Sequence, residues 1–137
     1  MPDLEGMLTK LEGATVEQLE LERTDRGLRA TTAGGRKQDV TVKRVGDDVV
    51  LESVAAPPGA VPEARRAKAR ARFIRRLWEV NARTDLVALG LDSYGRIVGT
   101  CRHPLATLDR PELESYLVAL VRECDRLEWL LTGEDRY

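Results

Sequence analysis

The residues with the clearest chemical potential are Cys101 and the only histidine, His103, two positions further along the chain. A cysteine becomes a nucleophile when a base lies within hydrogen-bonding reach of its sulfur. Residues 86–101 are typical of a β-hairpin, and side chains two apart on a strand point the same way in parallel, which seldom gives that hydrogen bond. We therefore expect His103 to be the polar tip of a strand, and we predict no catalytic residues.

No other pattern in the sequence indicates an active site, a cofactor or a bound metal. The glycine pair at 34–35 precedes neither a Lys-Ser/Thr pair nor a helix start, so we interpret it as a turn and not a phosphate loop. The acidic pair at 47–48 also lies in a predicted turn, and no calcium-loop or zinc-site spacing occurs. Cys101 and Cys124 are in no metal-ligand spacing, so we expect two buried apolar thiols. The sequence thus predicts a protein that is not an enzyme and uses no cofactor.

A run of cationic residues is the most unusual local feature: seven of the twelve residues from 65 to 76 are basic, namely Arg65, Arg66, Lys68, Arg70, Arg72, Arg75 and Arg76. Such a run can contact nucleic-acid phosphates, or it can be a solvated or protein-facing side of a helix. The whole chain has 22 basic and 23 acidic residues, so its formal net charge of −1 gives no general attraction to nucleic acid or to an anionic membrane. We favour the solvated or protein-facing interpretation. The alternative is a nucleic-acid-associated regulator that uses Arg65, Arg66, Arg70, Arg72 and Arg76 on a helix over residues 64–83.

The first half of the chain has the pattern of a short helix followed by an antiparallel meander. Apolar residues recur at three- and four-residue spacing over residues 3–12, which predicts an amphipathic helix. Short runs that alternate between apolar and polar residues then follow, separated by Gly- and Asp-containing turns at 24–27, 33–36 and 46–48. This pattern predicts three or four strands, and it leaves open whether residues 49–54 form a fourth strand or end the third.

The second half predicts a helix, a hairpin and a final helix. Residues 62–83 are helical in character, with an apolar side formed by Ala67, Ala71, Ile74, Leu77 and Trp78 and widened by Phe73 and Val80. After the hairpin, Asp109 and Glu112 form a capping-box pattern that opens a helix with an apolar stripe, Leu113, Leu117, Leu120, Cys124, Leu127 and Leu131. Because strands and helices do not alternate, the economical fold is α+β: a single antiparallel sheet flanked by helices, in the order helix, three or four strands, helix, two strands, helix.

Length and composition indicate the number of domains and the cellular location of the protein. A chain of 137 residues with 42% hydrophobic and 33% charged residues suits one folded domain over residues 1–137. Its longest apolar runs are far too short to span a bilayer, and the residues after Met1 lack the basic start and apolar run of a signal peptide. We therefore predict a cytoplasmic protein with no membrane partner.

Three aromatic residues lie at or beyond the edges of the predicted apolar stripes. Trp78 is at the edge of the stripe in the middle helix, and Tyr116 and Trp129 fall outside the main stripe of the last helix. A helix that is apolar on more than one side is either buried on both sides or part of an interface, and Trp and Tyr are frequent interface anchors. The sequence therefore offers these aromatics as candidates for partner binding.

The second half also resembles a known family. The resemblance covers roughly residues 73–131 and is carried by the segments at 77–81, 89–92, 95–98 and 104–108, which read LWEVN, LGLD, GRIV and PLATL. In these segments the chain is similar to the YbjN-like family and to class I type III secretion chaperones, the Tir chaperone-like proteins. The resemblance implies a type III secretion chaperone-like fold and a homodimer that binds an extended segment of a client or regulatory protein. It also implies that the middle helix makes the dimer contact, with Phe73, Leu77 and Trp78 at or near it.

Overall fold

The computed structural model describes residues 2–83 and 86–132, and for residues 129–132 it describes the backbone alone. Seven antiparallel strands form one sheet in the order β1-β2-β3-β4-β5-β7-β6. The strands are β1 (Thr15–Val16), β2 (Leu19–Thr24), β3 (Gly27–Thr31), β4 (Lys37–Val45), β5 (Asp48–Ala56), β6 (Ala88–Leu91) and β7 (Ile97–Pro104). The helices are α1 (Leu4–Leu11), α2 (Ala67–Ala82) and α3 (Arg110–Thr132), with 3₁₀ turns at Pro58–Ala60 and Leu105–Thr107. The predicted α+β class and element order are confirmed.

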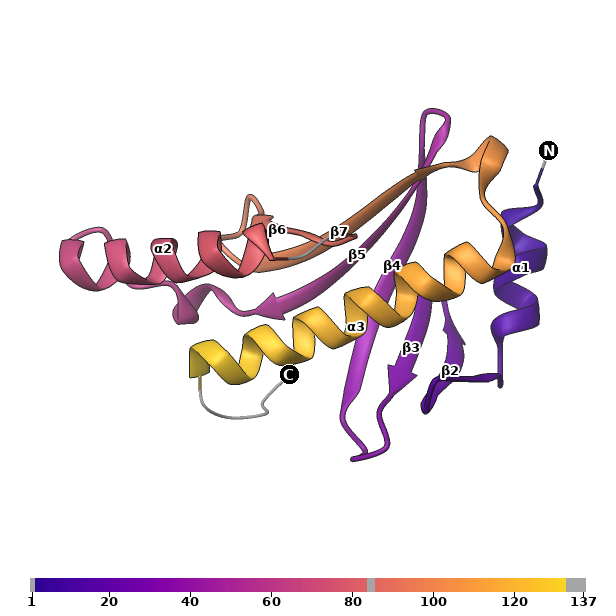
Figure 1. The fold of residues 1–137 in the computed structure, drawn as a ribbon, viewed down its shortest axis with the longest axis horizontal. Helices are drawn as coiled ribbons and strands as arrows, with labels where there is room; N and C mark the ends of the chain where they lie inside the picture. The colour runs from indigo at the N-terminus through magenta and orange to yellow at the C-terminus, as the bar shows by residue number, and fades with distance from the viewer. Residues whose placement is uncertain (1, 84–85, 133–137) are drawn as a thin grey trace.

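Helix α3 lies along one face of the sheet, while α1 and α2 lie at opposite ends of the molecule (Figure 1). The predicted stripe of α3 faces the sheet, and Leu113, Leu117, Leu120, Cys124 and Leu127 are fully buried. The predicted capping box is also present: the Glu112 N–H donates to Asp109 Oδ1 at 2.8 Å, and the Asp109 N–H donates to Glu112 Oε1 at 3.3 Å. This helix therefore closes the core from one side and leaves the other face of the sheet uncovered.

The strands follow the predicted alternation, with two additions. In β2, Leu19 and Leu21 are buried and the glutamates between and after them are exposed. Residues 49–54 belong to a separate strand, β5, which settles the question that the sequence left open. The short strand β1 was not predicted; it pairs with β2 through a tight turn in which Glu17 and Gln18 have φ of 45° and 73°.

Helix α2 begins later than the sequence predicts, at Ala67 and not at residue 62. The preceding segment forms a turn in which the Arg66 N–H donates to the Glu63 carbonyl at 2.9 Å. The Arg70 guanidinium donates to the Pro62 carbonyl at 3.0 Å, which holds that segment against the first helical turn. The boundary prediction was wrong because these contacts, which lie across a turn, replace the early helical hydrogen bonds.

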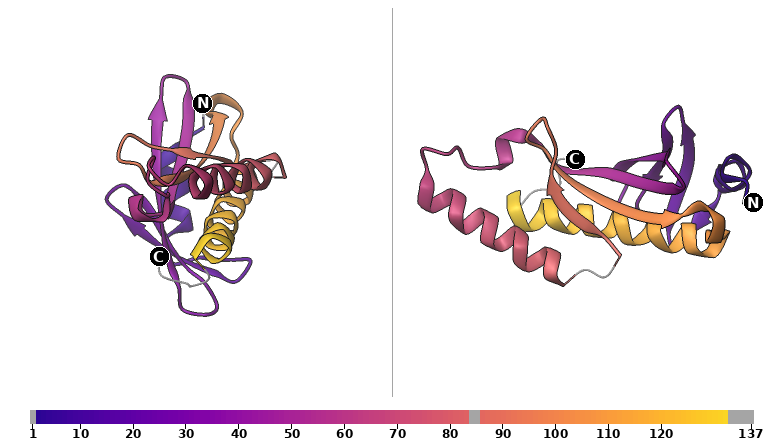
Figure 2. Two further views of the ribbon diagram at one scale, coloured as in Figure 1. Left: turned by 90° about the vertical axis from the view of Figure 1, so that its left-hand side faces the viewer. Right: turned by 90° about the horizontal axis from the view of Figure 1, so that it is seen from above.

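The apolar side of α2 is divided in the structure. Val80 is the buried residue of this helix, and Phe73 and Leu77 are partly buried against the core. Ile74 and Trp78, which the sequence places on the same side, keep 45% and 70% of their surface exposed. The helix is attached near its C-terminal end, where the Leu89 N–H donates to Asn81 Oδ1 at 2.9 Å, and its N-terminal part extends past the sheet (Figures 1 and 2). Among the described residues, no helix is both long and apolar enough to cross a membrane.

Candidate partner-binding surfaces

The Cys101–His103 pair does not form a nucleophile and its base. Cys101 is buried, its sulfur donates to the Tyr116 carbonyl at 3.8 Å, and desolvation raises its pKa to about 12. The imidazole is engaged elsewhere, with Nδ1 2.8 Å from the Tyr116 hydroxyl and Nε2 3.0 Å from Thr107 Oγ1. The arrangement keeps the thiol protonated and ties the end of β7 to α3.

The second thiol is equally inaccessible. Cys124 is fully buried, desolvation raises its pKa to about 12, and its sulfur donates to the Ser53 carbonyl at 3.7 Å. Both cysteines are free, so the prediction of buried thiols is confirmed. In the part of the chain that the structure describes, no group of three or more His, Cys, Asp or Glu side chains could hold a metal ion.

The uncovered face of the sheet carries a fork between β4 and β5. The two strands pair from Val45↔Asp48 to Thr41↔Glu52 and then separate, although both strands continue for four more residues. Beyond that point β4 stays paired with β3, and β5 stays paired with β7. The sheet therefore opens into two halves, both of which α3 contacts.

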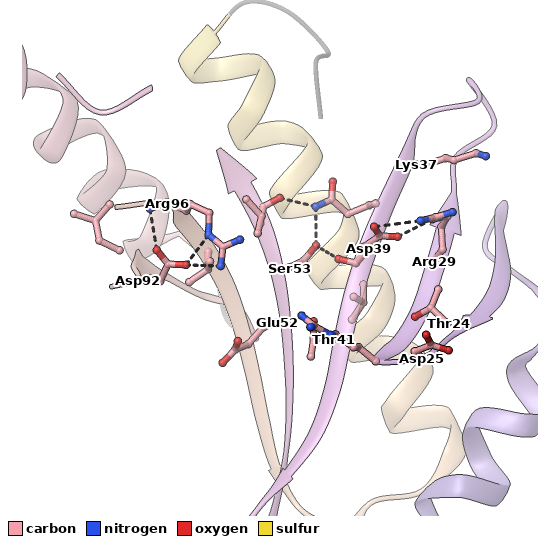
Figure 3. Close-up of a pocket in the computed structure, with 16 residues that line it drawn as sticks. Thr24, Asp25, Arg29, Lys37, Asp39, Thr41, Glu52, Ser53, Asp92 and Arg96 are labelled. Atoms are coloured by element: carbon pink, nitrogen blue, oxygen red, sulfur yellow. Dashed lines mark hydrogen bonds and ion pairs between the residues drawn. The ribbon is translucent and has the colours of Figure 1, made fainter. Parts of the chain in front are cut away.

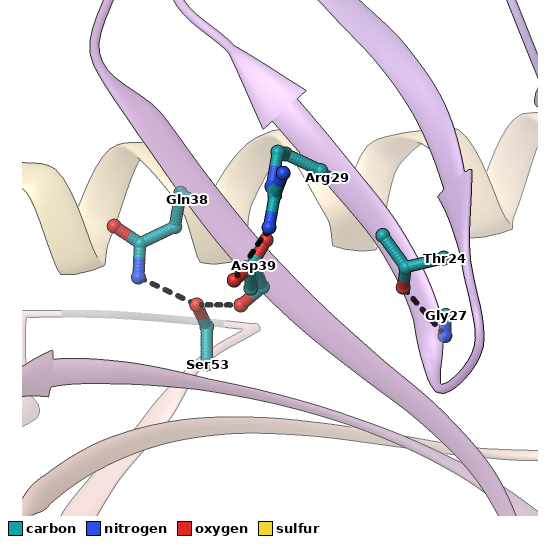
Figure 4. A network of polar contacts seen from close by, with 6 residues as sticks. All are labelled: Thr24, Gly27, Arg29, Gln38, Asp39 and Ser53. Atoms are coloured by element: carbon teal, nitrogen blue, oxygen red, sulfur yellow. Dashed lines mark hydrogen bonds and ion pairs between the residues drawn. The ribbon is translucent and has the colours of Figure 1, made fainter.

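Two side chains bridge the fork in place of the strand ladder. Ser53 Oγ donates to the Asp39 carbonyl and Gln38 Nε2 donates to Ser53 Oγ, each at 2.6 Å (Figure 4). Gln38 Nε2 also donates to the Val54 carbonyl at 2.6 Å. Gln38 and Ser53 are buried, with 7% and 3% of their surface exposed. Their mutual hydrogen bonds satisfy polar groups that would otherwise be desolvated without partners.

A groove of about 830 Å³ lies over this fork (Figure 3). It is lined by the β2–β3 turn, by β3, β4 and β5, and by the turn of the β6–β7 hairpin with the strand ends beside it. On one side, Arg29 Nε donates to Asp39 Oδ1 at 2.7 Å, and this hydrogen bond is the main cause of the raised pKa of Arg29. On the other side, Arg96 Nε donates to Asp92 Oδ2 at 2.7 Å. Desolvation raises the pKa of Asp92, but hydrogen bonds from Arg96 and Tyr94 outweigh it, so the net pKa is lowered.

The second candidate surface is the exposed side of α2. An apolar stripe of five exposed residues recurs on successive turns of the helix: Ala67, Ala71, Ile74, Trp78 and Ala82. A cation rank lies beside this stripe and consists of Lys68, Arg72 and Arg75, all exposed. We refer to these two sets as the apolar stripe and the cation rank.

The other candidate residues named from the sequence are scattered. Tyr116 is partly buried, and its hydroxyl contacts His103. The Trp129 side chain lies outside the described residues. Of the basic patch, Arg65 pairs with Glu63, and Arg70 is half-buried beside Pro62. Sequence reasoning did not single out Gln38 and Ser53, although a polar residue at an inward position in each of two neighbouring strands was a usable signal.

Comparison with known proteins relates this architecture to a family. The sequence profile of the Tir chaperone protein (CesT) family matches residues 30–128, which is most of the chain. The chain belongs to this family. The match confirms the resemblance to type III secretion chaperones, while the YbjN-like label stays a prediction. A protein of the Tir chaperone family binds partner proteins, and the groove and the exposed side of α2 are the two candidate surfaces for such a partner.

Solved structures share the fold of this Tir chaperone family member. A chain in the heterodimeric complex ExoU–SpcU, from the type III secretion system of Pseudomonas aeruginosa, aligns with a TM-score of 0.61 and 20% identity over 96% of this chain and 100% of that chain. An uncharacterized protein from Methanothermobacter thermautotrophicus aligns with a TM-score of 0.59 and 14% identity over 97% and 96%. A chain in the HopA1–SchA chaperone–effector complex aligns with a TM-score of 0.56 and 15% identity over 91% and 89%. Comparison with curated protein sequences gave no match.

Proposed function

We propose that this Tir chaperone family member is a non-enzymatic, cytoplasmic chaperone or adaptor that binds an extended segment of a client protein in the groove over the β4–β5 fork. The observation that carries this proposal is the end of the β4–β5 ladder at Thr41↔Glu52, while both strands continue. Strand edges without a partner strand are sites where an extended polypeptide can pair.

The backbone at the fork supports this mode of binding. The carbonyls of Asp39 and Val54 point into the gap, because each accepts a side-chain hydrogen bond from across it. In an antiparallel strand the N–H and C=O of one residue point to the same side, so the amides of these residues also face the gap. An extended client segment would therefore meet donors and acceptors on both sides, with the Arg29–Asp39 and Asp92–Arg96 pairs at the rims.

We also propose that two copies pair through the apolar stripe of α2. The stripe is symmetric about its middle: in an antiparallel pair of helices, Trp78 of one copy would lie opposite Ala71 of the other. An exposed tryptophan opposite a small residue is a suitable interface anchor. Phe73 and Leu77 would hold α2 on its own core, and Ile74 would join Trp78 in the contact.

The experiment that tests client binding is a pull-down with the tagged full chain from its host's lysate at low and moderate salt, followed by hydrogen exchange on the purified complex. We expect one dominant protein partner that survives moderate salt and protects the amides of residues 37–40 and 53–56. Protection confined to other parts of the chain would overturn the assignment of the groove as the client-binding site. Capture of no protein at either salt concentration would overturn the client-binding function.

A further inference from the structure

The charge of the molecule is strongly segregated along the chain. Residues 63–83 contain eight Lys or Arg and two Glu, which gives +6, while the remaining residues contain fourteen basic and twenty-one acidic side chains, which gives −7. Helix α2 extends past the sheet, so much of this positive charge lies at one end of the molecule (Figure 1). The formal charge of −1 therefore conceals a basic helix attached to an acidic body.

The cation rank is a part of this charge that has no partner among the described residues. Lys68, Arg72 and Arg75 recur at spacings of four and three, so they share one side of α2, next to the apolar stripe. Within residues 2–83 and 86–132, none of the three forms an ion pair or a side-chain hydrogen bond. Arg65 differs, because it pairs with Glu63 in the turn before the helix.

We propose that the cation rank binds an acidic segment of a partner protein, with Asp or Glu side chains on Lys68, Arg72 and Arg75 and an apolar side chain beside Ile74. This inference rests on the proposed function in one respect, namely that the partner is a protein, and it adds the chemistry of that partner. Guanidinium and ammonium groups in one row match carboxylates placed one helical turn apart. The adjacent stripe supplies the apolar contact that gives such a complex its affinity.

Two observations favour an acidic protein over nucleic acid. The rest of the chain carries a charge of −7, which repels a long polyanion more than a short acidic segment. The rank also adjoins the apolar stripe, which consists of three alanines, Ile74 and Trp78. Only Trp78 could stack on a nucleic-acid base, whereas all five residues can contact aliphatic side chains of a protein.

The rank also affects the pairing of two copies. An antiparallel pair that meets through the apolar stripe has its two-fold axis perpendicular to both helices, so both cation ranks lie on the same side of the seam. Like charges gathered in this way weaken the dimer. The partner's apolar side chain beside Ile74 would occupy part of the stripe through which the two copies pair, so partner binding and dimerisation should compete.

The test uses three labelled probes: a 16-residue peptide with Glu at positions i, i+4 and i+7 and Leu between them, a scrambled peptide of the same composition, and a 20-nucleotide single-stranded DNA. The variant is Lys68→Glu/Arg72→Glu/Arg75→Glu. Its matched control is Lys10→Glu/Arg44→Glu/Arg126→Glu, which makes the same charge change at exposed sites outside α2 and the groove. If circular dichroism shows that the charge reversal unfolds α2, the corresponding triple Gln variant replaces it.

We expect the patterned peptide to bind the wild type more tightly than the scrambled one, and the α2 variant to lose about tenfold or more in affinity at 0.15 M salt while the control changes little. DNA binding without peptide binding would overturn the proposal in favour of nucleic acid. Binding of neither the patterned peptide nor the DNA would also overturn it. Equal losses of peptide affinity in the α2 variant and the control variant would do the same. If the client captured by pull-down binds the α2 variant as tightly as the wild type, this inference fails and the proposed function stands.

Discussion

Ser53 donates a hydrogen bond from its hydroxyl to the backbone carbonyl of Asp39 at 2.6 Å, at the place where a strand-to-strand hydrogen bond would have continued the β4–β5 ladder. The Ser53 side chain thus bridges β4 and β5 where their backbones no longer pair. The same contact keeps the two half-sheets together under α3 and leaves the groove open on the other face. Stability and the proposed client binding at the fork therefore depend on the same few polar atoms.

The bridge itself can be measured with a double-mutant cycle on Gln38 and Ser53. We expect Gln38→Met and Ser53→Ala each to lower the free energy of unfolding by about 1–3 kcal/mol, because each leaves a buried polar group without its partner. The two changes should be coupled by about 0.5–1.5 kcal/mol in urea unfolding followed by circular dichroism. Thr41→Ala, in the last ladder pair and on the open face, is the control. Strict additivity would mean that the two side chains act separately.

The close approach of α3 to β7 depends on Gly99. A Cβ at this position would lie 2.8 Å from Leu120 Cδ1 and 2.9 Å from Cys124 Sγ, both in the buried stripe of α3. We expect Gly99→Ala to lower the free energy of unfolding by about 1–3 kcal/mol, because the helix must move or its side chains must leave their rotamers. Gly90→Ala, on the paired strand β6, meets nothing within 4 Å and should change the stability by less than about 0.5 kcal/mol. Equal effects at the two glycines would show that α3 does not constrain Gly99.

The two buried thiols should be unreactive in the folded protein. Desolvation raises the pKa of Cys101 and of Cys124 to about 12, so both are thiols at pH 8. We expect no reaction with Ellman's reagent at pH 8 in the native state and two equivalents after unfolding in urea. Rapid reaction of the native protein would contradict both the burial and the raised pKa values.

The same pKa shifts predict a loss of stability in alkali. The folded state keeps thiol protons that the unfolded chain releases above its ordinary pKa of about 9. This contribution to stability is therefore complete below pH 9 and is lost as the pH rises towards 12. A Cys101→Ala/Cys124→Ala variant should show a shallower fall in melting temperature between pH 9 and pH 11 than the wild type, and parallel curves would exclude the thiols as the cause.

The exposed side of α2 and its buried side should respond differently to substitution. We expect Trp78→Ala to abolish self-association in light scattering while changing the free energy of unfolding by less than about 0.5 kcal/mol, because Trp78 is 70% exposed in the single chain. Phe73→Ala is the matched change on the inward side and should destabilise the fold by about 1–2 kcal/mol. Retained self-association in Trp78→Ala would move the contact away from the apolar stripe.

Salt provides an independent check on the same contact. Because pairing through the stripe brings two cation ranks together, screening should strengthen the dimer as the salt concentration rises from about 0.05 to 0.5 M. A dimer that weakens with salt would instead be held by opposite charges.

The sequence alone was sufficient for the elements whose signals are local. The stripe of α3 and its Asp109–Glu112 capping box are set by spacings within one helix, and the structure reproduces both. The order of strands and turns was also readable, because alternation and Gly- or Asp-containing turns depend on neighbouring residues. The family resemblance in the second half of the chain pointed to the correct fold for the same reason.

Only the tertiary structure decided the features that depend on distant partners. Phe73 and Trp78 lie on one broad apolar side of the α2 sequence, and the position of the sheet determines which of them is covered. Gln38 and Ser53 are polar residues at inward positions of their strands, but neither strand's own sequence shows that the two side chains meet or that the ladder ends between them. Strand pairing and helix docking depend on contacts between residues that are far apart in the sequence. A pattern of neighbouring residues therefore does not determine them.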